Sequence, residues 1–171
     1  MKNIYLVGFM GTGKSAVGSE LAKKKNRQFV DLDGLIELRE KRSIADIFAQ
    51  EGEPYFRRIE SKVLKEVAKE NNFVVGCGGG IVIDERNVKI MKDNGMVICL
   101  SAAPEVILKR VSGSSHRPLL NVEDPKARIE LLLKLRSPYY AKAHNCIDTS
   151  RLSIKEVVAK IIKLLPAKRI K

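Results

Sequence analysis

Aromatic residues are scarce in this chain of 171 residues, which has 5 phenylalanines, 4 tyrosines and no tryptophan. Proteins that bind single-stranded nucleic acid stack bases on aromatic side chains, so such platforms are few here. The net charge of +12 is the feature that points to nucleic acid. Much of it comes from a basic tail, residues 155–171, and from a lysine cluster at residues 23–27, and such clusters are usually solvated. We therefore expect no nucleic-acid partner.

Cysteine and histidine are also rare, with 3 and 2 copies. Cys77, Cys99 and Cys146 show no C-x-x-C spacing, and each lies in or beside an apolar segment. We expect buried, reduced thiols rather than disulfides or zinc ligands. His116 and His144 lie far apart without a ligand-like pattern, which argues against a protein-bound transition metal.

Long hydrophobic runs are missing as well. No apolar stretch approaches the ~20 residues that a membrane span needs, and the N-terminus enters a strand-like segment without a cleavable signal pattern. We expect no membrane association and a cytoplasmic location. The length, with 44% hydrophobic and 30% charged residues, suits one domain with a sizeable core, which we expect to span residues 1–171.

One stretch of the chain is strongly specific. Residues 8–15 read GFMGTGKS and match the phosphate-binding pattern G-x-x-x-x-G-K-[ST], between a strand-like run and a helix-like run. Backbone N–H groups of such a loop, with the N-terminus of the following helix, point at phosphate oxygens. Lys14 can bridge the β- and γ-phosphates, and the Ser15 hydroxyl can bind Mg²⁺. The motif predicts a site for a nucleoside triphosphate and Mg²⁺.

Strand-like and helix-like segments alternate along the whole chain. The expected strands are residues 3–7, 28–33, 73–77, 96–100 and 145–148. The expected helices are residues 16–22, 34–41, 43–52, 53–71, 84–93, 104–111, 125–136 and 154–165. This alternation predicts an α/β fold with a five-stranded parallel sheet and helices on both faces. Ligands should then bind at the carboxyl ends of the strands.

Two carboxylates end the second expected strand. Asp31 and Asp33 stand two residues apart, which places them on the same face of a strand. One can hold the waters of a magnesium ion, and the other can accept a proton from an attacking hydroxyl. The third strand ends in a glycine run, Gly76-Cys77-Gly78-Gly79-Gly80, instead of the usual aspartate, so Asp31 is the candidate carboxylate near the metal. Three consecutive glycines indicate a backbone that a ligand approaches closely.

Four arginines are candidates for binding an anion. Arg57 and Arg58 lie early in an expected helix, Arg136 lies at a helix end, and Arg117 lies in a polar segment, residues 112–124, that we expect to be a mobile loop. Arginine binds carboxylates in a bidentate manner and stabilises a phosphoryl group in transfer. Each of them taken alone would more often be an ordinary surface charge.

Together these motifs resemble the shikimate kinases, and the resemblance runs from Asn3 to about Leu165. The stretches that carry it are residues 8–15, 31–33 (DLD), 43–48 (SIADIF), 52–53 (GE), 56–60 (FRRIE), 78–80 (GGG), 117–120 (RPLL), and Arg136 with Tyr139. The resemblance implies a three-layer fold like that of nucleoside monophosphate kinases. It also implies transfer of the ATP γ-phosphate to the 3-hydroxyl of shikimate in aromatic amino-acid biosynthesis, with Mg²⁺ as cofactor and a monomeric enzyme.

The resemblance further implies a role for each candidate residue. Lys14, Asp33 and Arg117 would be catalytic. ATP would be bound by Gly11, Thr12, Gly13, Lys14, Ser15, Ala16, Arg110, Arg117 and Arg151, and shikimate by Asp33, Arg57, Gly78, Gly79, Gly80 and Arg136. Ser15 would bind the metal directly and Asp31 would bind it through water. Residues 112–124 would form the lid, and the helices of residues 34–71 would hold the substrate.

Two alternatives stay open at this point. The first is another P-loop small-molecule kinase, with gluconate or a nucleoside monophosphate as the acceptor. Phe56 and Arg57 together with Arg136 favour one compact carboxylate instead. The second is an ATP-dependent nucleic-acid-binding module, which the basic charge would serve and the shortage of aromatic residues disfavours.

Overall fold

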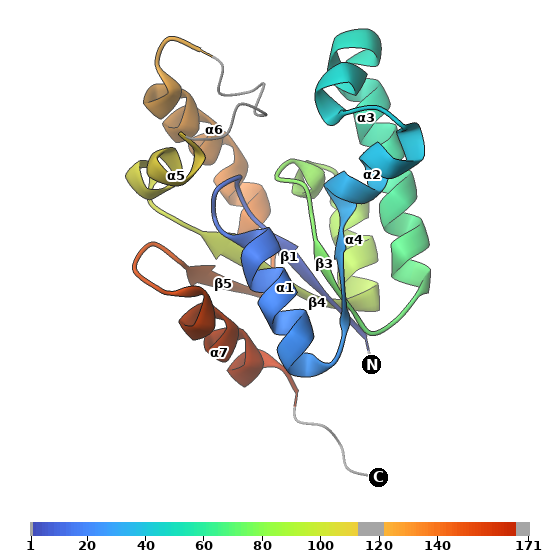
Figure 1. Cartoon of the computed structure of the whole chain (residues 1–171), viewed down its shortest axis with the longest axis vertical. Coiled ribbons are helices and arrows are strands. Elements are labelled where there is room, and N and C mark those ends of the chain that lie inside the picture. Colours follow the sequence, from blue (N-terminus) through green and yellow to red (C-terminus); the bar gives the residue numbers. More distant parts are fainter. Residues whose placement is uncertain (1, 113–121, 167–171) are drawn as a thin grey trace.

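Figure 1 shows the computed structural model, which describes residues 2–112 and 122–166. In this part of the chain, five strands form one parallel sheet in the order β2-β3-β1-β4-β5. The strands are β1 (Asn3–Val7), β2 (Gln28–Asp31), β3 (Phe73–Gly76), β4 (Gly95–Ser101) and β5 (Asn145–Asp148). The strand that precedes the P-loop is therefore central, with β3 and β4 as its neighbours. The predicted five-stranded parallel sheet is confirmed.

All the described helices but the last lie between successive strands, and together they cover both faces of the sheet. They are α1 (Lys14–Lys25), α2 (Leu32–Glu40), α3 (Ile44–Lys69), the 3₁₀ helix η1 (Ile81–Ile83), α4 (Glu85–Asn94), α5 (Pro104–Val111), α6 (Pro125–Tyr140) and α7 (Ile154–Leu164). In Figure 1, α1 and α7 lie on one side of the sheet, and α3 and α4 lie on the other. None of the helices described here is long and apolar enough to cross a bilayer.

The central strand explains why the sheet is covered twice. Ile4 and Leu6 face one cluster of buried side chains, which includes residues of α1 and α7. Tyr5 and Val7 alternate with them and face the other cluster, which includes residues of α3, α4 and α6. Successive side chains of a strand point to opposite faces, so a strand buried on both sides is apolar at nearly every position. The layers thus follow from the sequence of β1.

Two predicted helix boundaries need comment. The two helices expected at residues 43–52 and 53–71 form one kinked element, α3, in which Gly52 interrupts the helical backbone with a φ of 80°. The end expected at Arg136 is wrong, because α6 continues to Tyr140 through Pro138. A proline removes one N–H donor from a helix. Here the Ser137 hydroxyl donates to the Lys134 carbonyl, which is the group that this N–H would have reached, and the helix continues.

The three cysteines are free thiols, as expected, but their burial differs. Cys77 and Cys99 are buried, whereas Cys146 is exposed. The prediction that all three are buried is therefore wrong for Cys146. The reason is that β5 is an edge strand, in which Cys146 alternates with the buried Ile147.

Candidate active site

A cavity of about 460 Å³ lies beyond the carboxyl ends of β1, β2 and β3. It is lined by Met10, Gly11, Gly13, Lys14, Ser15, Ala16, Asp31, Asp33, Ile44, Phe48, Phe56, Arg57, Glu60, Gly76, Cys77, Gly78, Gly79, Gly80, Arg110 and Arg136. The P-loop, the two aspartates, the glycine run and three of the candidate arginines thus surround one space. Their sequence positions span more than a hundred residues, and the strand ends of the parallel sheet bring them together.

The P-loop begins with a glycine that the fold requires. Gly8 has a φ of 135°, and a Cβ at this position would overlap the Leu100 carbonyl oxygen of the neighbouring strand. The loop then closes around its own lysine, because Lys14 Nζ donates to the carbonyl oxygens of Gly8 at 2.8 Å and Phe9 at 3.0 Å. Thr12 does not line the cavity. It is buried and donates to the Phe9 carbonyl at 2.7 Å, so it supports the loop from within.

Ser15 and Asp31 face each other at the start of α1. The Ser15 hydroxyl donates to Asp31 Oδ2 at 2.9 Å. Asp31 also caps α2, because its side chain accepts the N–H of Asp33 at 3.2 Å. The prediction that Asp31 and Asp33 share one face of a strand is therefore wrong: β2 ends at Asp31, and Asp33 lies in the first turn of a helix. The two carboxylates still line the same cavity.

Asp33 is half-buried at the cavity, and its surroundings shift its pKa. Burial raises its pKa above the ordinary aspartate value, the neighbouring charge of Asp31 raises it further, and Lys14 and Arg57 act in the opposite direction. Its Oδ1 atom is buried without a hydrogen-bond partner among the described residues. Such an acceptor is costly to leave unsatisfied, so Asp33 is ready to accept a hydrogen bond from a bound molecule.

The glycine run leaves room for charged side chains of the protein itself. A Cβ on Gly78 would lie 2.9 Å from Asp33 Oδ1 and also too close to Glu60. A Cβ on Gly80 would overlap the Arg57 guanidinium, whose Cζ would be 2.7 Å away. None of these glycines has a positive φ, so space and not backbone conformation requires them. These side chains therefore lie close to the glycine backbone, and the close approach of a ligand stays a prediction.

Two arginines lie against successive glycines of this run. A Cβ on Gly79 would lie 3.7 Å from Arg136 Nη1 and 3.4 Å from the Gly8 carbonyl oxygen. Arg57 lies against Gly80, as described above. Arg136 is almost fully buried in α6, with its guanidinium over the ring of Phe9. Two guanidinium groups thus approach the glycine run from two different helices.

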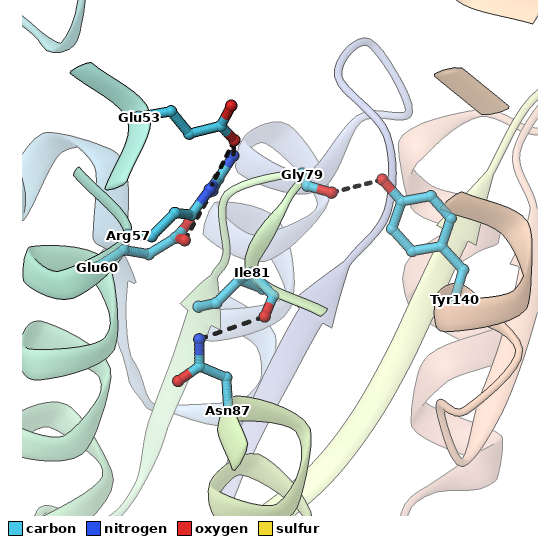
Figure 2. Close-up of polar contacts among 7 residues, drawn as sticks. All are labelled: Glu53, Arg57, Glu60, Gly79, Ile81, Asn87 and Tyr140. Carbon is cyan, nitrogen blue, oxygen red and sulfur yellow. Dashed lines mark hydrogen bonds and ion pairs between the residues drawn. The ribbon is translucent and has the colours of Figure 1, made fainter. Parts of the chain in front are cut away.

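Glu60 holds Arg57 in place and is a residue that the sequence analysis gave no role. Arg57 donates to Glu53 Oε1 at 2.9 Å and to Glu60 Oε2 at 2.7 Å, as Figure 2 shows. Glu60 is completely buried, and burial raises its pKa to about 7 although Arg57 acts in the opposite direction. A signal was present, since Glu60 stands in the apolar stripe of α3, where Phe56, Val63 and Leu64 are buried.

The remaining candidate arginines are placed differently. Arg110 reaches the cavity and donates to the carbonyl oxygens of Gly11 at 3.2 Å and Thr149 at 2.9 Å. Arg151 is exposed and does not line the cavity. Arg117 lies outside the described residues, together with residues 113–121 of the expected lid.

Thr149 was missed by the sequence analysis, although its hydroxyl joins the P-loop at Thr12 to strand β4 at Ser101.

The buried Glu60 predicts a pH-dependent stability. Its folded-state pKa is about 7, above the ordinary value of 4.5, so the folded protein retains a proton that the unfolded chain loses between these values. The stabilising contribution is therefore complete below pH 4.5 and lost as the pH rises through 7. We expect the wild type to lose up to about 3 kcal/mol of unfolding free energy between pH 4.5 and 8, relative to Glu60→Gln. Urea unfolding at several pH values measures this difference.

Glu53→Gln is the matched control, because Glu53 binds the same guanidinium from an exposed position. Its unfolding free energy should follow that of the wild type across the pH range. A difference between wild type and Glu60→Gln that stays constant from pH 4.5 to 8 would contradict the raised pKa of Glu60.

Comparison with known proteins agrees with this geometry. A family model described as shikimate kinase matches residues 10–166. The shikimate kinase of Thermodesulfovibrio yellowstonii is 46% identical over 163 residues, which cover 95% of this chain and 94% of that protein. The shikimate kinase of Acinetobacter baumannii in complex with shikimate has a TM-score of 0.94 at 38% identity, covering 100% of this chain and 96% of that one.

A further solved structure, the shikimate kinase of Aquifex aeolicus, has a TM-score of 0.83 at 37% identity and covers 94% of each chain. The family model and these relatives each extend over nearly the whole length of the protein. The same chain has the P-loop, the aspartates and the arginines around one cavity. The protein therefore belongs to the shikimate kinase family.

Proposed function

We propose that this protein transfers the γ-phosphoryl group of ATP to the 3-hydroxyl of shikimate, which gives shikimate 3-phosphate and ADP. The observation that carries the proposal is the composition of the cavity. A P-loop lines one part of it, and Asp33, Arg57 and Arg136 line another part across the glycine run. A related protein of the same fold is solved in complex with shikimate. A single space therefore offers sites for a triphosphate and for a hydroxylated carboxylate.

On the acceptor side, the charges suit a compact anion with hydroxyl groups. Arg57 and Arg136 would bind the carboxylate, because guanidinium groups match its planar geometry. Asp33 would bind the reacting hydroxyl through its unpartnered oxygen, and its raised pKa favours acceptance of the hydroxyl proton. Glu60 would keep Arg57 oriented from behind. These residues orient the acceptor, and that orientation supplies part of the rate enhancement.

On the nucleotide side, the P-loop would hold the phosphates. Lys14 already lies within the loop, and phosphate oxygens would replace the Gly8 and Phe9 carbonyl oxygens as its partners. When bound, Mg²⁺ would neutralise charge on the phosphates. Ser15 would hold the metal directly and Asp31 through water, and Mg²⁺ usually binds one or two such oxygen ligands and keeps its waters. The described residues contain no cluster of three or more His, Cys, Asp or Glu side chains that could form a complete metal cage.

An acceptor assay tests the proposed function directly. ADP release is followed by a coupled assay with ATP and Mg²⁺, with and without shikimate, and gluconate and nucleoside monophosphates serve as competing acceptors. We expect ADP release only with shikimate. Release that depends on gluconate or a nucleotide instead would establish another small-molecule kinase. Steeply salt-dependent DNA binding without acceptor-dependent turnover would favour the nucleic-acid module. A monomeric state and a cytoplasmic location stay predictions.

Removing either acceptor arginine should mainly weaken shikimate binding. In Arg57→Ala and Arg136→Ala we expect KM for shikimate to rise by roughly 10- to 100-fold, since a charge-assisted hydrogen bond contributes about 1.5–3 kcal/mol. Both groups bind one carboxylate, so the double variant should lose less than the sum of the two effects. Steady-state kinetics at saturating ATP measures these changes.

Arg58→Ala is the matched control, since Arg58 packs over the ring of Tyr55 and does not line the cavity. Its KM for shikimate should stay near that of the wild type. Unchanged shikimate affinity in both Arg57→Ala and Arg136→Ala would place the acceptor site elsewhere.

A further inference from the structure

Tyr140 links the last turn of α6 to the glycine run. Its hydroxyl donates to the Gly79 carbonyl oxygen at 2.6 Å, across 61 positions of the sequence. The side chain is almost fully buried. A buried hydroxyl thus binds one particular backbone carbonyl, and that carbonyl belongs to a segment that lines the cavity.

This contact fixes the orientation of one peptide group. The described residues contain no cis peptide bond, and in a trans peptide the carbonyl of Gly79 and the N–H of Gly80 point in opposite directions. The carbonyl points to Tyr140, so the Gly80 N–H points away from α6. Figure 2 shows Tyr140 and Arg57 on opposite sides of the segment. The N–H is therefore directed to the side on which Arg57 lies.

Because glycine is conformationally free, the orientation of this peptide depends on the contacts that hold it. Neither Gly79 nor Gly80 has a Cβ, so rotation of the peptide between them meets little steric resistance. The following residue is held separately, because the Ile81 carbonyl oxygen accepts from Asn87 in α4 at 3.3 Å. The Ile81 N–H also donates to the Gly78 carbonyl oxygen at 3.2 Å, which closes a turn around the Gly79–Gly80 peptide. Among the described residues, Tyr140 is the side chain that hydrogen-bonds this peptide directly, and Asn87 binds the residue that follows it.

The same hydroxyl also contacts an acceptor arginine. Arg136 lies one helical turn before Tyr140, on the same face of α6. Burial raises the pKa of Tyr140 to about 12, and the charge of Arg136 and a hydrogen bond from it act in the opposite direction. The phenol is therefore neutral at ordinary pH. It can donate its proton to Gly79 while its oxygen accepts from the guanidinium.

We propose that Tyr140 is a positioning residue of the acceptor site, which orients the Gly79–Gly80 peptide and Arg136 together. It touches neither substrate in this assignment and acts through these two groups. The inference rests on the proposed function, because it takes the glycine run as part of the acceptor site. It adds a residue to that site that no sequence motif indicated, since the helix carrying it was expected to end before it.

The test compares Tyr140→Phe with Tyr139→Phe. Tyr139 precedes it in the same helix and lies against Lys142 instead of the glycine run. In Tyr140→Phe we expect KM for shikimate to rise about three- to tenfold, as for the loss of one hydrogen bond of ordinary strength, with KM for ATP unchanged. In Tyr139→Phe both constants should stay at the wild-type values.

Amide hydrogen exchange, followed by mass spectrometry without any substrate, supplies a second readout. We expect faster exchange in Tyr140→Phe confined to peptides that contain residues 76–84, because the freed peptide opens locally. Wild-type KM values together with wild-type exchange would overturn the inference, and so would exchange that rises equally throughout the sheet. If the wild type does not phosphorylate shikimate, the proposed function fails, and the exchange experiment still decides whether Tyr140 orients the segment.

Discussion

Replacement of Lys14 by methionine or alanine should abolish turnover, with kcat lowered by at least about 100-fold. Lys14 is the P-loop side chain that can follow negative charge as it moves to the bridge between the β- and γ-phosphates. A neutral side chain removes this interaction from the transition state. Methionine keeps most of the apolar stem, so its use separates loss of charge from loss of packing.

Lys23→Ala is the control for Lys14, because it removes an exposed lysine from the last turn of the same helix. Its kcat should equal that of the wild type. Lys14 also donates to the Gly8 and Phe9 carbonyl oxygens, so its replacement removes two contacts within the loop. Circular dichroism therefore serves to check that each variant is folded. A Lys14→Met enzyme that keeps more than about a tenth of wild-type kcat would remove Lys14 from the catalytic residues.

The second large effect is expected for Asp33→Asn, which should lower kcat by about 100-fold or more. Asparagine has nearly the same shape, but its amide cannot accept a proton from the acceptor hydroxyl. The pH profile gives a separate signature. Because burial raises the pKa of Asp33, the acid limb of kcat/KM in the wild type should lie above the ordinary aspartate range. This limb should be absent in Asp33→Asn.

A comparison with Asp46→Asn controls for the loss of a carboxylate, since Asp46 lies exposed in the first turn of α3 and does not line the cavity. That variant should keep the wild-type kcat and pH profile. If Asp33→Asn also keeps the wild-type kcat and raises only KM for shikimate, then Asp33 orients the acceptor and takes no proton.

The P-loop and the layers could be predicted because each depends on short-range patterns. Residues 8–15 carry the phosphate loop in consecutive positions, and the apolar run at residues 4–7 of β1 indicates a strand covered on both faces. The family resemblance could be stated for the same reason, because its motifs are short and contiguous. The family model and the relatives then confirm it.

Other parts of the site depend on packing, which short patterns do not contain. Asp33 was expected on a strand, but Asp31 caps a helix that begins at Leu32, so Asp33 lies in that helix. The burial of Glu60 is set by how α3 packs beside the glycine run. Tyr140 was missed because the helix was expected to end at Arg136, whereas α6 continues through Pro138 to Tyr140. In each case one side-chain hydrogen bond or one packing contact decides the outcome.

The strand order has a consequence for how the protein is made. Ile4 of β1 pairs with Val74 and Met96, and the P-loop residue Thr12 is held by Thr149. During synthesis from the N-terminus, the phosphate loop emerges early, whereas Thr149, which joins it to the sheet, emerges late. Folds rich in such distant contacts form slowly, because chain entropy is lost before the contacts stabilise it. We therefore expect the nucleotide site to form late in folding, so ATP would not guide the first steps.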